Sequence, residues 1–428
     1  MTAPDLSAPP NNARNWALIR LVVAIASPAP ILRLGHVTAI WEPHLDPLVE
    51  SLIFGVGIFA AATLLTWASE VAETEMSAGL ALVILALIAV LPEYAVDLYF
   101  AWTAPDNPDN AHLAVANMTG GNRLLVGLAW PALFFIFYWR TRVKELPVMR
   151  SNAMGIMFLG AATIYSFSIP LRGHLSLVDT GVMFGLFGAY MYLASRFPPE
   201  LEREFVGPAK AIAALDKVQR RTVIALIFAF AAAVIFAAAE PFAEGLVETG
   251  KDVGIDEFVL VQWVAPLASE SPEFILAAML AARGRHDAGM TVLISSKVNQ
   301  WTLLIGSLPL AYSISAGEIS ALDFDTRQAE EVFLTAGQSL FAVAIFVSLS
   351  MSWWEAAALA GLFGTQFFFT DTTVRVGYGV AYSVLALLVL IRDIPLFGNF
   401  ISAARETALE PHLIHERDGR DRAPPQME

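Results

Sequence analysis

Long apolar runs dominate this chain, and they restrict its fold more than any other feature of the sequence. Two examples are "SAGLALVILALIAV", from Ser77, and "TVIALIFAFAAAVIFAAA", from Thr222. A run of about 20 apolar residues is long enough for a helix to cross the hydrocarbon core of a bilayer. Because 56% of the 428 residues are hydrophobic and only 15% are charged, the composition excludes a soluble globular protein. The sequence therefore predicts an all-α polytopic membrane protein.

The apolar runs divide into two halves around a charged linker at 196–220. The predicted spans are 15–37, 48–71, 77–103, 111–138, 152–170, 175–195, 221–247, 256–282, 287–312, 329–350, 353–370 and 375–392. The transmembrane halves are thus 15–195 and 221–392, with twelve spans, or ten if the first and last do not cross the bilayer. We expect the polar segments 1–14 and 393–428 to be disordered.

Lysine and arginine gather in alternate loops, which indicates the cytoplasmic side of the membrane. They collect between Arg140 and Arg150, along the linker, at Arg283 and Arg285, and in the tail, whereas loops such as "APDNPDN" are acidic or neutral. Both termini are then cytoplasmic, which requires an even number of spans. We expect an integral protein of the prokaryotic plasma (inner) membrane. The sequence leaves the oligomeric state open, and a monomer is compatible with it.

Two parts of the chain, 77–138 and 256–312, resemble each other and are predicted to have opposite orientations. They contain "AVLPEYAVDLYFAW" and "SESPEFILAAMLAA", each with a Pro-Glu pair deep in a predicted span. The next span opens in each case with a small polar cluster, at 116–131 and at 294–309. The loop between the first two spans falls outside, and the loop between the second two falls inside. This arrangement is typical of a transporter with inverted-topology repeats, in which broken helices meet at mid-membrane.

The Pro-Glu pairs put polar groups where an apolar helix normally has none. Proline has no N–H, so Pro92 and Pro272 each leave a backbone carbonyl of the preceding turn without its hydrogen bond. Such carbonyls are tolerated at bilayer depth where they line a cavity, and a carboxylate there costs about 2.5–3.5 kcal/mol. A negative, oxygen-rich place suits a hard cation such as Ca²⁺. One pair alone is equally well explained as a kink, but two matching pairs favour a cation site that includes Glu93 and Glu273.

At these residues the chain resembles the cation/calcium exchanger superfamily, which includes the sodium–calcium and proton–calcium exchangers. Sodium–calcium members carry two inverted repeats, each with a G-T-S-x-P-E motif followed by a G-N-x-x-G-S-N-x-x-N motif. The resemblance covers about 75–140 and 255–312 by motifs, and the other helices by their spacing. It implies a secondary antiporter without a cofactor, whose transported ions are Ca²⁺ and Na⁺ or H⁺.

The family motifs and the local charges together give a set of candidate ion-binding residues. They are Glu93, Glu273, Glu270, Asp97, Asn117, Asn122, Ser269, Ser271, Ser295 and Ser296. Glu93 and Glu273 match the paired ion-binding glutamates of the family and are the implied metal ligands. Asn117 and Asn122 match the first polar motif, and Ser269 matches the threonine of the second repeat.

The chain also departs from the family pattern, and most departures add charge. Glu270 stands where serine is usual, one turn before Glu273, and Asp97 lies one turn after Glu93, so four acids share two helix faces. The Gly-Thr-Ser positions of the first repeat, 88–90, hold Ile, Ala and Val. Buried like charges raise one another's pKa. We therefore expect some of these acids to titrate where protons compete with metal.

Two basic residues, Lys297 and Arg123, occupy neighbouring positions in the two polar clusters. Lys297 stands where Asn or Asp is usual, so its ammonium is a candidate tethered cation that replaces one coupling Na⁺, or a group that couples transport to protons. The alternative is that both bases form structural salt bridges with Asp97 and Glu270. Both hypotheses leave fewer places for Na⁺ than a sodium–calcium exchanger has.

The leading functional hypothesis is a secondary active antiporter that exchanges Ca²⁺, or another divalent cation, for Na⁺ or H⁺ by alternating access. One alternative is a monovalent cation/proton exchanger on the same fold, and another is a non-transporting membrane sensor with a neutralised ion site. An enzyme is not supported, because no nucleophile–base set can be assembled from the intramembrane residues. The sequence also has no phosphate-binding loop and no H-E-x-x-H pair, which argues against ATP-driven pumping and membrane metalloproteolysis. We expect the lipid bilayer and inorganic cations as partners, and no nucleic acid.

Overall fold

The computed structural model of the chain describes residues 12–38, 45–72, 74, 91–196, 205, 207–366 and 371–409. Its α-helices are α1 (Asn12–Ala26), α2 (Pro28–Thr38), α3 (Pro47–Ala72), α5 (Leu91–Thr103), α6 (Asp109–Leu124), α7 (Trp130–Thr141), α8 (Ala153–Ser166), α9 (Ser168–Arg172), α10 (Leu177–Ala194), α11 (Pro208–Ala213), α12 (Lys217–Val253), α13 (Glu257–Ala282), α14 (His286–Asn299), α15 (Ile305–Ala316), α16 (Thr326–Ile345), α17 (Trp353–Thr365), α18 (Thr372–Arg392) and α19 (Phe397–Leu409). The π-helical turns η1 (Leu125–Ala129) and η3 (Gln300–Leu304) connect α6 to α7 and α14 to α15. The 3₁₀ turns are η2 (Arg150–Asn152), η4 (Phe346–Ser348) and η6 (Ile394–Leu396). The short strands are β1 (Glu145–Pro147), β2 (His174–Leu175), β3 (Leu322–Asp323) and β4 (Ser350–Ser352).

The helices lie where the apolar runs predict them. Nine helical runs within the described ranges are long and apolar enough to cross a membrane. Every one of the predicted spans overlaps a helix, although residues 77–90 of the third span lie outside the described part of the chain. The strands form ladders of only two or three residue pairs. The predicted all-α membrane fold is therefore confirmed.

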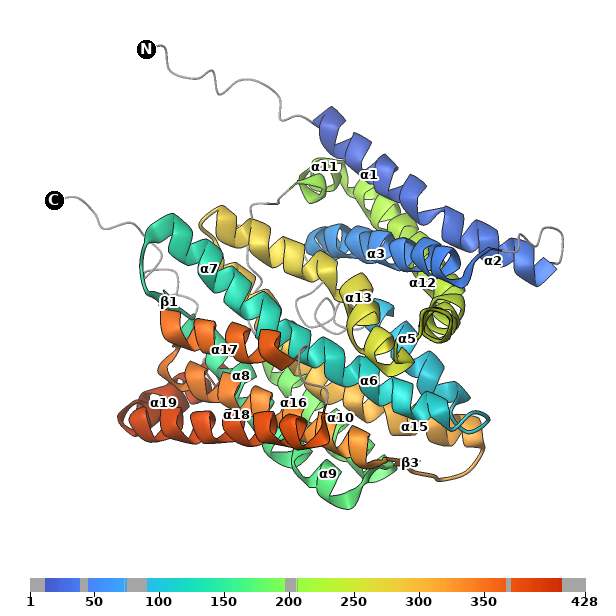
Figure 1. Ribbon diagram of the computed structural model, residues 1–428. Helices are drawn as coiled ribbons and strands as arrows, with labels where there is room; N and C mark the ends of the chain where they lie inside the picture. The colour runs from blue at the N-terminus through green and yellow to red at the C-terminus, as the bar shows by residue number, and fades with distance from the viewer. Residues whose placement is uncertain are drawn as a thin grey trace, which may run out of the picture.

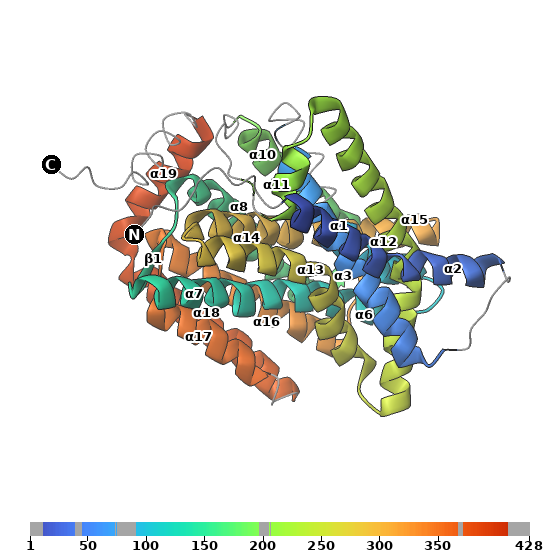
Figure 2. The ribbon, with the colours of Figure 1, turned by 90° about the horizontal axis from the view of Figure 1, so that it is seen from above.

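The helices pack in groups around a central run (Figure 1). α1, α3 and α12 lie together on one side, and α8, α16, α18 and α19 lie on the other, with the long α6–η1–α7 run and α13 between them. Seen from above, α1 crosses α3 and α12 (Figure 2). Buried apolar side chains from all of these groups form one core cluster, so the groups pack as one body.

Two parts of the structure repeat each other with the chain direction reversed. The α6–η1–α7 and α14–η3–α15 runs each join two helices through a π turn, and η3 begins 175 residues after η1, the separation that also relates Asn122 to Lys297. α7 contacts β1 and α15 contacts β3, and these two strands lie at opposite ends of the molecule (Figure 1). The ladders β1–β4 and β2–β3 each join one half of the chain to the other. This arrangement agrees with inverted repeats.

Proline interrupts α13, the helix that carries the second Pro-Glu pair. Pro266 and Pro272 lie inside α13, and the ribbon of α13 changes direction along its length (Figure 1). Pro92 is the second described residue of α5 and follows a segment that lies outside the described residues. The predicted break before Pro92 falls on residues 75–90, outside the described residues.

The prediction of a disordered tail is wrong for residues 397–409, which form α19. The buried residues of α19 are Phe400, Ala403, Ala404 and Thr407. Their spacing of three or four positions gives the helix one buried face, and this face packs against α8. Residues 12–14, also predicted to be disordered, form the first turn of α1.

Candidate functional site

A small pocket between α5, α6, α13 and η3 brings together half of the predicted ion-binding residues. Its lining consists of Glu93, Asp97, Asn117, Met118, Gly121, Pro266, Ser269, Glu270, Gln300 and Leu304. α5 and α6 belong to the first half of the chain and α13 and η3 to the second, so the pocket lies where the repeats meet. As the described side chains stand, no water-sized sphere fits between them, and the pocket is closed.

Two acids enter the pocket from adjacent turns of α5. Glu93 and Asp97 are only 3% and 1% exposed, and their spacing of four residues puts them on one face of the helix. The side chain of Asn117, on α6, hydrogen-bonds to Asp97. Both oxygens of Glu93 and one oxygen of Asp97 have no hydrogen-bond partner among the described residues. Because buried carboxylates normally have partners, these oxygens are available to a ligand.

α13 supplies the acids of the second half. Glu270 is 2% exposed and Glu273 is half-buried. Both lie close enough to Glu93 for the charges to interact, so the bent helices bring acids from the two halves together. Gln300 hydrogen-bonds to Glu270, and Ser296 hydrogen-bonds to Glu273. Each acid of α13 is therefore oriented by a side chain from the α14–η3 run.

Two adjacent glycines let α6 approach α13 closely. A methyl group on Gly120 would overlap the backbone carbonyl of Gln262, and one on Gly121 would overlap the carboxylate of Glu270. The approach is possible because neither glycine has a side chain. The position of Glu270 in the pocket thus depends on the absence of a Cβ at residue 121.

Lys297 of α14 is fully buried beside the acids. Its Nζ donates to Asn122 Oδ1 at 2.7 Å and to Asn122 O at 3.3 Å. The ammonium lies 4.4 Å from the centre of the Trp301 ring, a cation–π contact, and its charge interacts with that of Glu270. Asn122 and Lys297 are separated by the repeat distance of 175 residues, so they occupy equivalent positions in the two halves.

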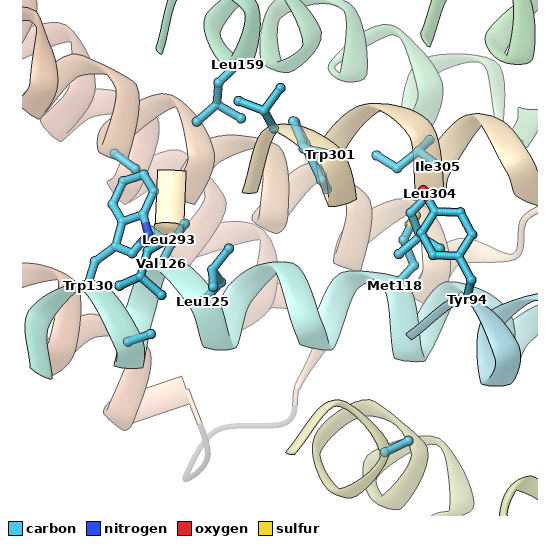
Figure 3. Close-up of a cluster of buried hydrophobic side chains, with 14 of the residues drawn as sticks. Tyr94, Met118, Leu125, Val126, Trp130, Leu159, Leu293, Trp301, Leu304 and Ile305 are labelled. Carbon is cyan, nitrogen blue, oxygen red and sulfur yellow. The ribbon is translucent and has the colours of Figure 1, made fainter. Parts of the chain in front are cut away.

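Apolar side chains surround the polar groups. In the cluster of buried apolar side chains in Figure 3, Tyr94, Met118 and Leu304 lie at one end and Trp130 lies at the other. Trp301 lies between the two ends (Figure 3). Met118 and Leu304 also line the pocket. Because these side chains exclude water, charges inside the pocket interact more strongly than they would in solvent.

Some predicted ion-binding residues lie outside the pocket lining. The hydroxyl of Ser271 donates to the backbone carbonyl of Leu267, back along its own helix. Ser295 Oγ lies 3.4 Å from the hydroxyl of Tyr190. Asn122 reaches the site only through Lys297. Glu273, one of the two implied metal ligands, is also absent from the lining, although it lies close to Glu93. The structure therefore places Glu273, Asn122 and Ser296 beside the pocket, and Ser271 and Ser295 further away.

Arg123 does not pair with Asp97 or Glu270, as one of the sequence-based alternatives supposed. Its Nη2 lies 2.5 Å from Glu331 Oε2 on α16, and it is not part of the pocket lining. Successive residues of an α-helix point about 100° apart. Asn122 therefore faces Lys297 while its neighbour faces another helix.

The charge balance of the site restricts what it binds. Four carboxyl groups, from Glu93, Asp97, Glu270 and Glu273, lie near one lysine, so the acids outnumber the base by three in formal charge. In the described part of the chain, no three acidic or histidine side chains are close enough to ligate one metal ion by themselves. A bound cation would therefore also need amide, hydroxyl or main-chain oxygens, or a rearrangement of the acids.

Sequence reasoning missed some residues of the site. Gln300 stands at the last Asn place of the second family motif, which was a usable signal for a polar ligand. Met118 and Leu304 line the pocket but look like any other apolar residue of a membrane helix. Glu331, which pairs with Arg123 outside the pocket, stands in the polar beginning of α16, where an acid is not a distinctive signal.

Comparison with known proteins places this geometry among cation transporters. A family model described as sodium/calcium exchanger protein matches residues 48–196 and 223–370. The crystal structure of an H⁺/Ca²⁺ exchanger, CAX, is 40% identical to this chain with a TM-score of 0.85, and the match covers 93% of this chain and 99% of CAX. Two structures of YfkE, one described as a Ca²⁺/H⁺ antiporter, are 15% and 17% identical with TM-scores of 0.58 and 0.55. They cover 85% and 88% of this chain and 99% of their own, and support the fold alone. None of the curated proteins matches.

Proposed function

Because the chain belongs to the sodium/calcium exchanger family, whose members are secondary transporters and not enzymes, we propose that it exchanges Ca²⁺ for protons across the membrane. The observation that carries this proposal is the buried pocket where acids from both halves meet beside a lysine. The protein is an integral membrane protein. We further propose that it resides in the plasma membrane of a prokaryote with both termini in the cytoplasm. Loops rich in lysine and arginine mark the cytoplasmic side, and they alternate along the chain with acidic or neutral loops.

The donor atoms around the pocket suit a hard divalent cation. Ca²⁺ takes about 6–8 oxygen ligands in a flexible geometry. Glu93 and Glu273 offer carboxylates from opposite halves that lie close to each other. Asn117, Ser269 and Gln300 line the pocket with Glu93 and add amide and hydroxyl oxygens. An ion held by both halves is exposed to one side or the other when the halves move relative to each other, which is the basis of alternating access.

Protons suit this pocket better than Na⁺ as the counter-ion. When Ca²⁺ leaves, ionised acids would remain in a buried site without their cation, and buried negative charges are costly unless they are neutralised. Protons neutralise carboxylates without needing coordination space. Lys297 already places a positive charge where the sodium–calcium pattern has Asn or Asp, so a Na⁺ ion there would be repelled. The similarity to an H⁺/Ca²⁺ exchanger points the same way.

Ion flux in proteoliposomes tests the proposal directly. We expect ⁴⁵Ca²⁺ uptake to rise several-fold when a pH gradient is imposed, with protons moving in the opposite direction, and to ignore a Na⁺ gradient. Folded protein that moves no Ca²⁺ under either gradient would contradict Ca²⁺ transport. Uptake driven by Na⁺ alone would contradict proton coupling and leave the Ca²⁺ site in place.

Replacing Lys297 by asparagine is expected to make Ca²⁺ transport sensitive to Na⁺. The variant loses the ammonium that balances Glu270 and gains the amide that the sodium–calcium pattern has at this place. External Na⁺ should then inhibit ⁴⁵Ca²⁺ uptake several-fold more strongly than in the wild type, as measured by a Na⁺ titration in proteoliposomes. Lys251→Asn, at an exposed position near the end of α12, is the matched control and should behave like the wild type. Equal Na⁺ sensitivity of all three proteins would show that Lys297 does not exclude Na⁺.

A further inference from the structure

A second buried cluster of charges lies against α6, next to the pocket but outside it. Arg123 and Glu331, whose ion pair is 2.5 Å long, have side chains that are 2% and 4% exposed. Arg375 of α18 lies 3.2 Å from Glu330 and 3.9 Å from Glu331. The guanidinium of Arg123 also lies 4.9 Å from the centre of the Trp263 ring, on α13. The cluster joins α6, α13, α16 and α18, and its two arginines and two glutamates balance in charge.

The inverted repeat indicates that the fold does not require charges at this place. The residue 175 positions after Arg123, at the equivalent place before η3, is Val298, which is fully buried and apolar. Well-packed apolar residues are often as stabilising as a buried ion pair, or more so. Stability alone therefore does not explain why Arg123 and Glu331 are charged.

The pair holds α6 at the point where the helix geometry changes. Arg123 directly follows Asn122, and η1 begins two residues later. A π turn bonds at i→i+5 instead of i→i+4, which leaves a main-chain carbonyl before it without its usual partner. Side chains donate here instead, Lys297 Nζ to Asn122 O at 3.3 Å and Gln338 Nε2 to Arg123 O at 3.4 Å. Lys297 thus holds α6 from the pocket side, while Gln338 and Glu331 hold it from α16.

We propose that Arg123, Glu331 and Gln338 are positioning residues that fix the rotation of α6, so that Asn122 keeps the Lys297 ammonium beside the acids and the pocket keeps its affinity for Ca²⁺. This inference rests on the proposed transport of Ca²⁺ at that pocket. Without the contacts of Arg123 with Glu331 and Gln338, α6 turns about its axis, and both Asn122 and Asn117 move relative to α13. Groups that orient metal ligands from the second layer typically change metal affinity about 10–100-fold.

Gln338→Met tests this role without disturbing the ion pair. Gln338 Oε1 has no hydrogen-bond partner among the described residues, so methionine of similar size removes an uncompensated polar atom together with the donor to Arg123 O. We expect the KM for Ca²⁺ in proteoliposomes to rise about 10-fold, with the melting temperature in detergent unchanged or higher. A KM equal to that of the wild type in this folded variant overturns the role of Gln338.

The double variant Arg123→Gln/Glu331→Gln tests the ion pair itself. It removes one positive and one negative charge, and Arg375 retains Glu330 as its partner. We expect the KM for Ca²⁺ to rise at least as much as in Gln338→Met, and more than the maximal rate falls. A double variant that is less stable but has the wild-type KM overturns the proposal for the pair.

The double variant Arg172→Gln/Asp179→Asn is a matched control. It removes another ion pair, in which the nitrogen and oxygen are also 2.5 Å apart and the acid is fully buried. Neither residue lines the pocket. This control should lower the melting temperature and leave the KM for Ca²⁺ unchanged. If the KM for Ca²⁺ rises equally in both double variants, the rise reflects a general loss of structure, and the inference is overturned. A wild-type protein without Ca²⁺ flux overturns the proposed function together with this inference, whereas an active wild type with unaffected variants overturns the inference alone.

Discussion

Glutamine in place of Glu93 is expected to reduce Ca²⁺ transport by about 100-fold or more, since even groups behind the ligands change metal affinity about 10–100-fold. The substitution keeps the size of the side chain and one oxygen, but it removes the charge and the ability to carry a proton. Both carboxylate oxygens are buried without a hydrogen-bond partner in the described structure, and their attraction for a divalent ion is strong where water is excluded. Uptake of ⁴⁵Ca²⁺ under a pH gradient measures the effect, and calorimetric Ca²⁺ titration of the same protein shows whether binding is lost. Glu273→Gln should behave in the same way.

The matched control for this prediction is Glu355→Gln, at another buried glutamate. Glu355 accepts hydrogen bonds from Ser352 and Arg392 at the start of α17, so its role is structural. Its replacement should lower thermal stability by about 1–3 kcal/mol, the cost of leaving buried partners unsatisfied, and leave transport near the wild-type rate. Wild-type transport by Glu93→Gln would mean that the pocket does not hold the cargo.

The positions of two pocket acids, Glu93 and Glu270, were predictable because the sequence shows carboxylates inside apolar helices, where they are energetically unfavourable. Glu93 and Glu270 lie in apolar helices next to prolines, and a carboxylate at such a depth is rarely present without a function. The match between the two Pro-Glu segments also indicated that the helices come together. Both residues line the pocket. That they bind an ion remains a prediction.

The partners of the basic residues were not predictable, because they depend on the rotation of single helices. Asn122 and Arg123 are neighbours in sequence, yet one contacts α14 and the other α16. The π turns η1 and η3, which alter the rotation of the next helix, leave no recognisable trace in the residue pattern. Sequence reasoning therefore found the charges but assigned Arg123 to the wrong cluster.

The helix α19 was missed for a different reason. Its buried face recurs at helical spacing over 397–409 and was readable as an amphipathic pattern. The strongly charged residues that come after it in the tail made the whole segment look polar. The helical spacing was therefore a usable signal, and the structure adds that the apolar face of this helix packs on α8.

The two halves have a similar backbone arrangement, but the side chains at equivalent positions where they meet are different. Asn122 and Lys297 occupy equivalent positions and bond directly to each other, so an amide in one half faces an ammonium in the other. A symmetrical pair of amides would leave space and oxygen atoms for a further cation. The lysine instead supplies a fixed positive charge, which lowers the number of mobile cations that the pocket needs for neutrality. This asymmetry is the physical basis for expecting protons in place of several Na⁺ ions.

Alanine in place of Gly120 is expected to destabilise the protein by at least about 3 kcal/mol, the upper range for overpacked interiors, and to abolish transport. The added methyl group would overlap the main-chain carbonyl of Gln262, which cannot rotate away as a side chain does. α6 must then separate from α13, and the acids of the two halves separate with them. The melting temperature in detergent and ⁴⁵Ca²⁺ uptake measure the two effects.

The control for Gly120→Ala is Gly185→Ala, within α10, where an added methyl group meets no atom within 4 Å. Alanine favours a helix over glycine by about 1 kcal/mol, so this variant should be as stable as the wild type or slightly more stable, with normal transport. The comparison separates close packing from helix propensity, because both variants make the same chemical change inside a helix. If Gly120→Ala melts and transports like Gly185→Ala, α6 and α13 do not pack as closely as described. The pocket would then be wider than its present lining allows.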